Sequence, residues 1–291
     1  MGLLDAYLIP TIDGLAYGLL LFTVAAGLTL TFGVGDVLNL AHGTMYALGA
    51  YAAAALGDGS WAGLGLAVVV GTAAGAAGGG LLSVALAPLT GRGHLTQALL
   101  TFGMALAAGA VLVLAFGADD LRPTIPAALD TAVAVGDHRY PVYRLGFIVA
   151  AAVFAACGWL VIRRTRAGAR VRAVVDDRDM LACLGTSPRT VLAVVLSAGG
   201  ALAGLAGALG APIIGPGPRT ADTVLLLSLV IVVLGGLGSI GGAFVAAVIV
   251  GQVQSLGVVL APAWAPYLLF AAMAAVLVLR HRRVLVLGGR S

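Results

Sequence analysis

The stretch from Gly27 to Ala54 reads GLTLTFGVGDVLNLAHGTMYALGAYAAA. It begins as an apolar run suited to a bilayer, breaks at Gly33-Val34-Gly35-Asp36, and passes through a polar cluster before apolar residues return. Lipid offers no hydrogen-bond partners, so backbone groups freed by the break must be satisfied inside protein or at a watery cavity. Because broken helices of this kind favour permeation pathways, we take four polar or small residues of the break as candidate translocation residues: Asn39, His42, Gly43 and Thr44.

The composition agrees with a membrane location. Hydrophobic residues make up 61% of the 291 residues, charged residues make up 10%, and the mean hydropathy is +1.09. Repeated apolar runs near the length of a bilayer span predict an all-α, polytopic helical membrane protein in a single domain over residues 1–291, with about eight or nine spans and some broken or re-entrant helices. The expected spans are 10–32, 42–56, 61–87, 95–117, 145–162, 190–209, 223–237, 241–260 and 265–280.

A second interruption occurs in LVIVVLGGLGSIGGAFVAAVIVGQ, residues 229–252. It also follows a span rich in β-branched residues and precedes an alanine-rich helix. Paired interruptions in two halves of a membrane chain point to a transport site. The candidate pathway residues of this second break are Gly235, Gly236, Gly238 and Ser239.

The charged residues predict the orientation. Every basic residue besides histidine is Arg and every acidic residue is Asp. Twelve of the sixteen Arg residues fall at Arg92, between Arg163 and Arg189, and from Arg280 to Arg290. Positive residues accumulate on the cytoplasmic side, so the N-terminus is expected outside and the C-terminus in the cytoplasm. The absence of Lys excludes a Walker A phosphate loop, so another chain would have to bind ATP.

The segment 163–190 has the helical periodicity and capping residues of folded structure, which a simple connecting loop does not need. Val171, Val174 and Val175 form an apolar stripe at helical spacing, and Asp177 is placed to cap a second short helix that ends at Gly185. Two short amphipathic helices suit docking into a groove on a partner. A solvated basic loop that only determines topology is the alternative.

The longest loop on the other side covers residues 118–144. Val133 and Val135 precede Gly136-Asp137, and Tyr140 and Val142 follow, which predicts a small hairpin at the membrane surface. Its mixed charges could steer a soluble partner, or the loop could simply be solvated.

Glycines at a spacing of four residues predict close helix packing. Gly71, Gly75 and Gly79 form one set, and Gly200 and Gly204 form another. Packing within the chain is favoured over a dimer contact, and Gly75→Ala is expected to reduce transport less than Gly43→Leu or Gly236→Leu at the two breaks.

Four motifs in order along the chain carry a family resemblance. They are NLAHG (39–43) followed by Gly49-Ala50-Tyr51, TRAGARVRAVVDDRDMLACLGTSP (165–188), ALAGLAGAL (201–209) and VVLGGLGSIGGA (232–243). Together they resemble the permease subunits of branched-chain amino acid ABC importers, and the length is similar to the shorter of the two family permeases. Members also import urea, short amides or other small amino acids.

The resemblance implies a heteromeric importer in a bacterial-type inner membrane. Its partners would be a second permease, two cytoplasmic ATPases that bind the ATP, and an external substrate-binding protein, with no cofactor in this chain and no nucleic acid. The residues that match the family's cytoplasmic pattern are assigned to ATPase coupling, with Arg170 replacing the Arg that relatives carry at Ala169. These residues are Gly168, Arg170, Arg172, Ala173, Asp176, Ala182, Leu184 and Gly185. From their interruptions and small or polar residues, we expect both breaks to pack near the contact with the second permease and to expose backbone towards a narrow translocation route.

An ion-coupled secondary transporter of small solutes is the main alternative. Such proteins place ionisable relays within the bilayer, and only Asp36, Asp13 and Asp222 could serve. The four His and two Cys residues are scattered, so neither a catalytic nor a metal site is expected. His42 either supports the broken backbone or lines the pathway, and Asp36 is a candidate cap for the helix that follows.

Overall fold

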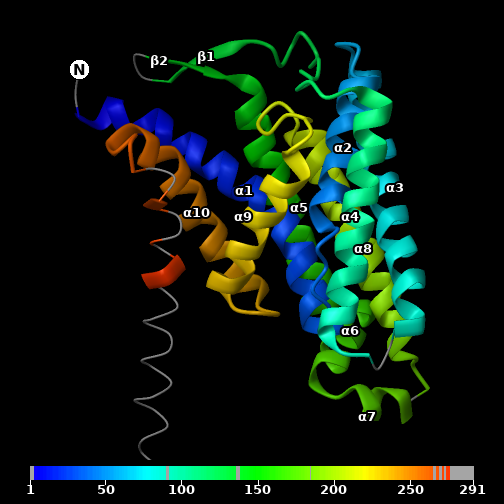
Figure 1. Cartoon of the computed structure of the whole chain (residues 1–291). Helices are drawn as coiled ribbons and strands as arrows, with labels where there is room; N and C mark the ends of the chain where they lie inside the picture. Colours follow the sequence, from blue (N-terminus) through cyan, green and yellow to red (C-terminus); the bar gives the residue numbers. More distant parts are fainter. Residues whose placement is uncertain are drawn as a thin grey trace, which may run out of the picture.

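The computed structural model describes residues 3–89, 92–135, 138–183, 185–264, 267–268, 271 and 273–275. Helices dominate, and one antiparallel hairpin joins two of them, as Figure 1 shows. The elements are α1 (Leu3–Gly35), α2 (His42–Leu56), α3 (Trp61–Leu86), the 3₁₀ turn η1 (Ala87–Leu89), α4 (His94–Phe116), β1 (Ala132–Val135), β2 (His138–Pro141), α5 (Val142–Arg164), α6 (Arg166–Asp176), α7 (Arg178–Cys183), α8 (Pro188–Gly210), α9 (Thr220–Gly235) and α10 (Ile240–Leu260).

The helix lengths separate full spans from shorter helices. Within the described residues, six segments are long and apolar enough to cross a membrane. The helices α2 and α9 have 15 and 16 residues, or about 22–24 Å at 1.5 Å per residue, which is short of a hydrocarbon core of about 30 Å. The expected count of eight or nine spans, which included broken helices, is therefore not confirmed. The ninth, 265–280, lies largely outside the described residues.

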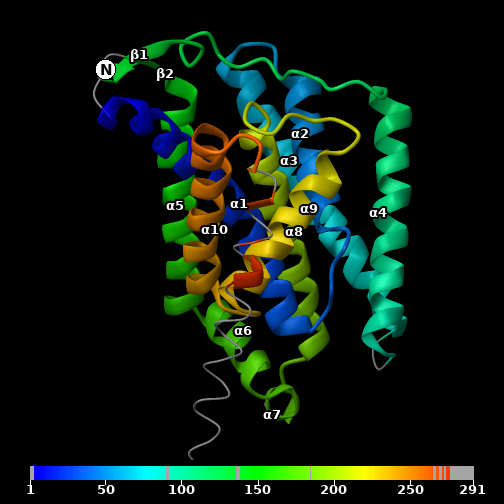
Figure 2. The ribbon, with the colours of Figure 1, turned by 60° about the vertical axis from the view of Figure 1, so that its left-hand side comes forward.

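The helix α1 occupies the centre of the bundle. It packs against α5, α8, α9 and α10, and Figures 1 and 2 both show it surrounded by other helices. Leu20, Leu21 and Val24 on α1 are fully buried. A helix that is apolar on all sides is stable only where neighbours or lipid cover every face, and α1 is covered by neighbours.

The predicted glycine stripes bring α3 and α8 into close contact. A Cβ at Gly75 would lie 2.1 Å from the carbonyl oxygen of Gly200, and one at Gly204 would lie 2.2 Å from that of Gly71. The prediction of packing within the chain is confirmed. Backbone atoms fill the space that a methyl group at Gly75 would need, so even Gly75→Ala disturbs this contact. Its effect on transport relative to Gly43→Leu and Gly236→Leu stays a prediction.

The helices α4 and α5 are the most exposed of the spans. Figure 2 shows them at opposite edges of the bundle. Both are apolar along their length, and their exposed faces carry large residues such as Leu114 and Val149. Such faces are suited to lipid or to a partner chain.

The outer hairpin forms as predicted. Val133 pairs with Tyr140, and Val135 pairs with His138. The Tyr140 hydroxyl donates to Asp13 Oδ1 on α1 at 2.7 Å, and Arg144 at the start of α5 also bonds Asp13. Burial and this carboxylate both raise the pKa of Tyr140, so its hydroxyl keeps its proton. The hairpin is thereby attached to the N-terminal part of α1.

Candidate functional site

The first break begins at an exposed residue and returns into the bundle. After α1 ends at Gly35, Asp36 takes a left-handed conformation (φ 51°), and the chain turns back in an extended segment to His42. His42 Nε2 lies 2.9 Å from the carbonyl oxygen of Val24. Val24 precedes Gly35 by eleven residues, so α2 begins about 16 Å along α1 from its end. Figure 1 shows the connecting segment returning into the bundle.

The backbone of the returning segment finds its partner on α4. The hydroxyl of Thr101 accepts from the Leu40 N–H at 3.1 Å, and its one hydrogen is shared between the carbonyl oxygens of Leu38 and of Ala98 on its own helix, each at 3.0 Å. Thr101 is fully buried. The sequence analysis did not identify this residue, although one hydroxyl within the apolar run of α4 was a signal for it. Backbone groups at membrane depth are thus satisfied inside the protein, as expected.

Asn39 and His42 serve this backbone and retain unused polar atoms. The Asn39 side-chain oxygen accepts from the Ala41 N–H at 3.0 Å, and His42 Nε2–H donates to α1. Both side chains are buried. Asn39 Nδ2 and His42 Nδ1 have no hydrogen-bond partner within the described part of the chain. The structural role anticipated for His42 therefore has a specific contact.

Gly43 and Thr44 place the start of α2 against α9. A Cβ at Gly43 would lie 2.0 Å from the carbonyl oxygen of Ala221. Thr44 is buried beside it in the first turn of α2. Only glycine permits this approach of two backbones, so Gly43 determines where α9 begins relative to the break.

The second break is a tight turn between α9 and α10. Gly236 and Gly238 have φ values of 91° and 78°, a region that favours glycine. The Ser239 hydroxyl accepts from the Gly242 N–H at 3.1 Å and caps α10. A Cβ at Gly235 would lie 2.4 Å from the amide nitrogen of Ala243, so this glycine allows α9 and α10 to meet closely.

The two breaks lie at opposite ends of α9. Gly43 contacts Ala221 in the first turn of α9, whereas Gly235 is its last residue, and fourteen residues of helix span about 21 Å. Both breaks are held on α1 instead. His42 bonds Val24, and the Cα of Gly238 would lie 3.0 Å from a Cβ at Gly33.

Asp36 does not cap α2. Its carboxylate lies 3.5 Å from His94 Nε2, and its carbonyl oxygen lies 3.1 Å from His94 Nδ1. The residue at the cap position of α2 is Ala41, which makes no side-chain cap bond. The prediction is wrong because α1 extends to Gly35, which makes Asp36 the residue after one helix rather than before the next.

The segment 163–190 forms the two predicted short helices, α6 and α7. The Thr165 hydroxyl accepts from the Gly168 N–H at 3.1 Å, and the Arg172 guanidinium donates to the Ile162 carbonyl oxygen at the end of α5. A Cβ at Gly168 would lie 2.2 Å from the same carbonyl oxygen. The corner between α5 and α6 is therefore close and needs glycine.

The apolar stripe of α6 is narrower than predicted. Val174 is 2% exposed and packs with Val34 of α1 and with Val191 and Val195 of α8, whereas Val175 is 52% exposed. Successive residues of a helix differ by about 100°, so Val174 and Val175 lie on opposite sides of the partly buried Val171, and only the Val174 side faces the bundle. Ala173 packs at the edge of the same cluster.

The remaining coupling residues lie along α6 and α7. Asp177 Oδ1 accepts from the Met180 N–H at 2.9 Å, which confirms the predicted cap of α7, and Gly185 follows α7 with φ of 80°. Arg170 and Ala182 are exposed, and Asp176 is the last residue of α6. Leu184 lies outside the described residues.

Known proteins resemble this chain over most of its length. The family described as branched-chain amino acid transport system / permease component matches residues 11–278. The high-affinity branched-chain amino acid transport system permease protein LivH, from Salmonella typhimurium and from Escherichia coli K12, is 27% identical over 268 residues, covering 84% of this chain and 83% of LivH. BraD of Pseudomonas aeruginosa is 27% identical over 270 residues, 86% of each chain. No solved structure matches the chain at a comparable level.

The fold defines a polytopic helical membrane protein, with six candidate spans around α1 and a pair of short helices at one end. The chain belongs to the family of permease components of branched-chain amino acid transport systems. It is a membrane-spanning subunit of an ABC importer and a transport component rather than an enzyme, which confirms the resemblance noted in its motifs.

Proposed function

We propose that α6 and α7 dock on a cytoplasmic ATPase and pass its movement to the bundle. The proposal rests on one observation: one face of α6 packs on the bundle, and another face is exposed. Val174 is buried against Val34 near the end of α1, while Arg170 and Val175 are exposed. A rigid helix with one face in the bundle and another exposed can transmit displacement to α1, which holds both breaks.

The segment Asn39–Thr44 contributes to the translocation pathway in this proposal. Buried polar groups normally find hydrogen-bond partners, yet Asn39 Nδ2 and His42 Nδ1 have none within the described residues. Both atoms are closed to solvent, so a buried water, or a solute admitted when the break moves, would supply these partners. The break Gly235–Ser239, packed on the same helix α1, would move with it.

The substrate follows from the relatives, whose names describe high-affinity branched-chain amino acid transport. We assign branched-chain amino acids or related small polar solutes, such as urea or amides, to this chain. A second permease, two ATPases and an external binding protein complete the importer. The Arg-rich helices α6 and α7 are assigned to the cytoplasm and the hairpin to the outside of the inner membrane, by the positive-inside rule.

The carboxylates argue against an ion-coupled secondary transporter. A proton or sodium relay needs an ionisable group open to the pathway. Asp13 is paired with Arg144 and Tyr140, Asp36 is exposed beside His94, and Asp222 is exposed in the first turn of α9. Each of these three carboxylates is therefore either bound to another side chain or exposed at the surface, and none serves as an ion relay within the bundle.

Reconstitution tests the proposal directly. The full chain would be purified from its native membrane with its associated subunits and placed in proteoliposomes with the co-encoded binding protein. We expect uptake of labelled leucine, or of another small polar solute that the binding protein retains, to require ATP and the binding protein. Uptake that follows an imposed proton or sodium gradient without ATP would contradict the proposal.

A further inference from the structure

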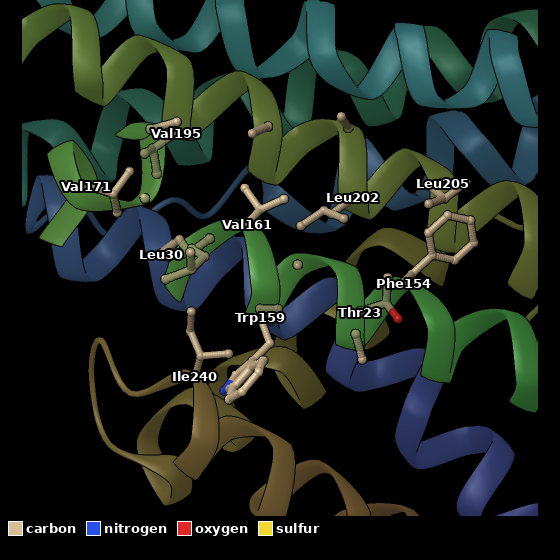
Figure 3. Close-up of a pocket in the computed structure, with 18 of the residues that line it drawn as sticks. Thr23, Leu30, Phe154, Trp159, Val161, Val171, Val195, Leu202, Leu205 and Ile240 are labelled. Carbon is tan, nitrogen blue, oxygen red and sulfur yellow. The ribbon is translucent and has the colours of Figure 1, made fainter. Parts of the chain in front are cut away.

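A groove opens along the side of the bundle between α5 and α8, with α1 as its floor. Its volume is about 370 Å³, within the range of about 300–1,000 Å³ typical of ligand sites. Figure 3 shows Leu30 from α1, Phe154 and Trp159 from α5, and Leu202 and Leu205 from α8 around it. No charged side chain occurs among the described residues that line it.

This lining does not suit the transported solute. A zwitterionic amino acid would need partners for its ammonium and carboxylate groups, and burying either group without them is costly. The Thr23 hydroxyl, visible in Figure 3, already donates to the Leu19 carbonyl oxygen of its own helix at 2.9 Å. The Thr72 hydroxyl on the wall has no partner within the described residues, but one neutral hydroxyl does not complement both charges of an amino acid. The groove therefore suits a hydrocarbon chain.

One end of the groove is cationic and lies at the level of a membrane interface. The Arg163 guanidinium carbon lies 4.7 Å from the centroid of the Trp159 ring, and Arg164 follows in the last turn of α5. Trp and Arg near the end of a span mark the headgroup region. A second cavity of about 180 Å³ shares Leu30, Ile162, Val171 and Ile240 with the groove and is lined by Arg172.

We propose that this groove binds one acyl chain of an anionic phospholipid, with the phosphate at Arg163 and the chain directed towards Phe154 and Leu205. Apolar walls accept the chain, and the guanidinium complements the negative headgroup. The site is separate from the first break, whose backbone is held by α4 at the opposite edge of the bundle from α5 (Figure 2). It does not rest on the proposed substrate.

Two glycines of α5 provide a matched test of the groove. Gly158 lines it and Gly146 does not, and a Cβ at either position would have no described atom within 4 Å. The full chain would be titrated with phosphatidylglycerol or phosphatidylcholine and examined by native mass spectrometry. We expect wild type and Gly146→Trp to retain one phosphatidylglycerol, and Gly158→Trp to retain at least tenfold less. Equal retention by Gly158→Trp and Gly146→Trp would overturn the proposal.

The headgroup contact is tested separately. Arg163→Gln should lose most of the preference for phosphatidylglycerol over phosphatidylcholine, whereas Arg92→Gln, an exposed Arg before α4, should keep it. If Arg163→Gln keeps the preference for phosphatidylglycerol over phosphatidylcholine, Arg163 does not bind the phosphate and the proposal is overturned.

Photocrosslinking decides between lipid and protein as the occupant. Phe154 would be replaced by p-benzoylphenylalanine, which preserves an aromatic side chain in the groove, and the full chain would be irradiated in its native membrane. We expect a crosslink to phospholipid, seen as a mass increase on the α5 peptide. A crosslink to a polypeptide, from this chain or from a second permease, would show that a helix occupies the groove and would overturn the proposal.

Discussion

Single glycines and one threonine determine how this bundle is assembled. At Gly43, Gly75 and Gly204 the backbone of a neighbouring helix occupies the place of a side chain. Helices in lipid associate through van der Waals contact and not through exclusion of water, so small residues at the interface matter more than in a soluble core. The hydroxyl of Thr101 stabilises the returning segment, because it accepts from the Leu40 N–H and lies within hydrogen-bond distance of the Leu38 carbonyl oxygen.

Gly75→Ala should destabilise the protein strongly for so small a change. The new methyl group would lie 2.1 Å from the Gly200 carbonyl oxygen, so α3 and α8 must separate. Overpacking of this kind costs about 1–3 kcal/mol. The unfolding temperature in detergent measures the effect, and Gly103→Ala on α4, where a Cβ has no described neighbour within 4 Å, is the control. Equal unfolding temperatures for the two variants would contradict the α3–α8 contact.

Thr101→Val should weaken the first break while preserving side-chain shape. It removes the acceptor of the Leu40 N–H and the donor to the Leu38 carbonyl oxygen, and each unsatisfied group costs about 1–3 kcal/mol. We expect lower thermal stability and reduced uptake. Thr101→Ser retains the hydroxyl and should stay close to wild type. Wild-type stability and uptake in Thr101→Val would show that Thr101 does not stabilise the backbone of the first break.

At the scale of elements, the short helices carry the specific geometry. The helices α2 and α9 are too short to span a bilayer, and α2 begins inside the bundle at the fully buried His42. The helix α6 is anchored to α5 through Arg172 and to α1 through Val174. The outer hairpin is anchored through Tyr140. Each anchor attaches a surface element to a helix of the bundle.

Arg172→Glu should uncouple ATP hydrolysis from uptake. The Arg172 guanidinium holds α6 to the Ile162 carbonyl oxygen at the end of α5, and a carboxylate there would repel that oxygen. We expect uptake to fall at least tenfold while the assembled transporter still hydrolyses ATP. Arg92→Glu, at the far edge of the bundle, is the control for charge reversal. Wild-type uptake by a correctly assembled Arg172→Glu variant would contradict the coupling role of α6.

Tyr140→Phe should loosen the outer hairpin. It removes the hydroxyl that donates to Asp13 Oδ1 at 2.7 Å, and hydrogen bonds to charged groups contribute about 1.5–3 kcal/mol. We expect faster hydrogen exchange in residues 132–141 and a lower unfolding temperature. Tyr7→Phe, whose side chain is exposed on α1, should change neither. Unchanged exchange in the hairpin would show that Arg144 alone holds this corner.

At the scale of the whole molecule, the α6–α7 pair and the hairpin lie at opposite ends of the bundle, as Figure 1 shows. A single cysteine at Ser187 or at Thr131 reports the orientation, because both residues are exposed. The background must lack Cys157 and Cys183, which are also exposed. In intact cells an impermeant thiol reagent should label Thr131→Cys and spare Ser187→Cys. The reverse pattern would invert the proposed topology.

The sequence was sufficient for much of the architecture. Apolar runs, caps and glycines predicted nearly all of the helices within a few residues, and also the hairpin and the α6–α7 pair. These features are local: periodicity, Asp177 as a cap and Gly185 as a terminator all act within one or two turns. Four motifs in order were likewise sufficient for the family.

Only the tertiary structure decided which groups meet. The partner of His42 lies eighteen residues away on α1, and Thr101 lies more than sixty residues from the segment that it holds. The structure also corrected the roles of Asp36 and Val175 and showed how closely Gly200 approaches Gly75, because a residue's role depends on which helix faces it and how closely. Such contacts form between elements distant in sequence, where local propensity carries no information, so their identity follows from how the helices pack around α1.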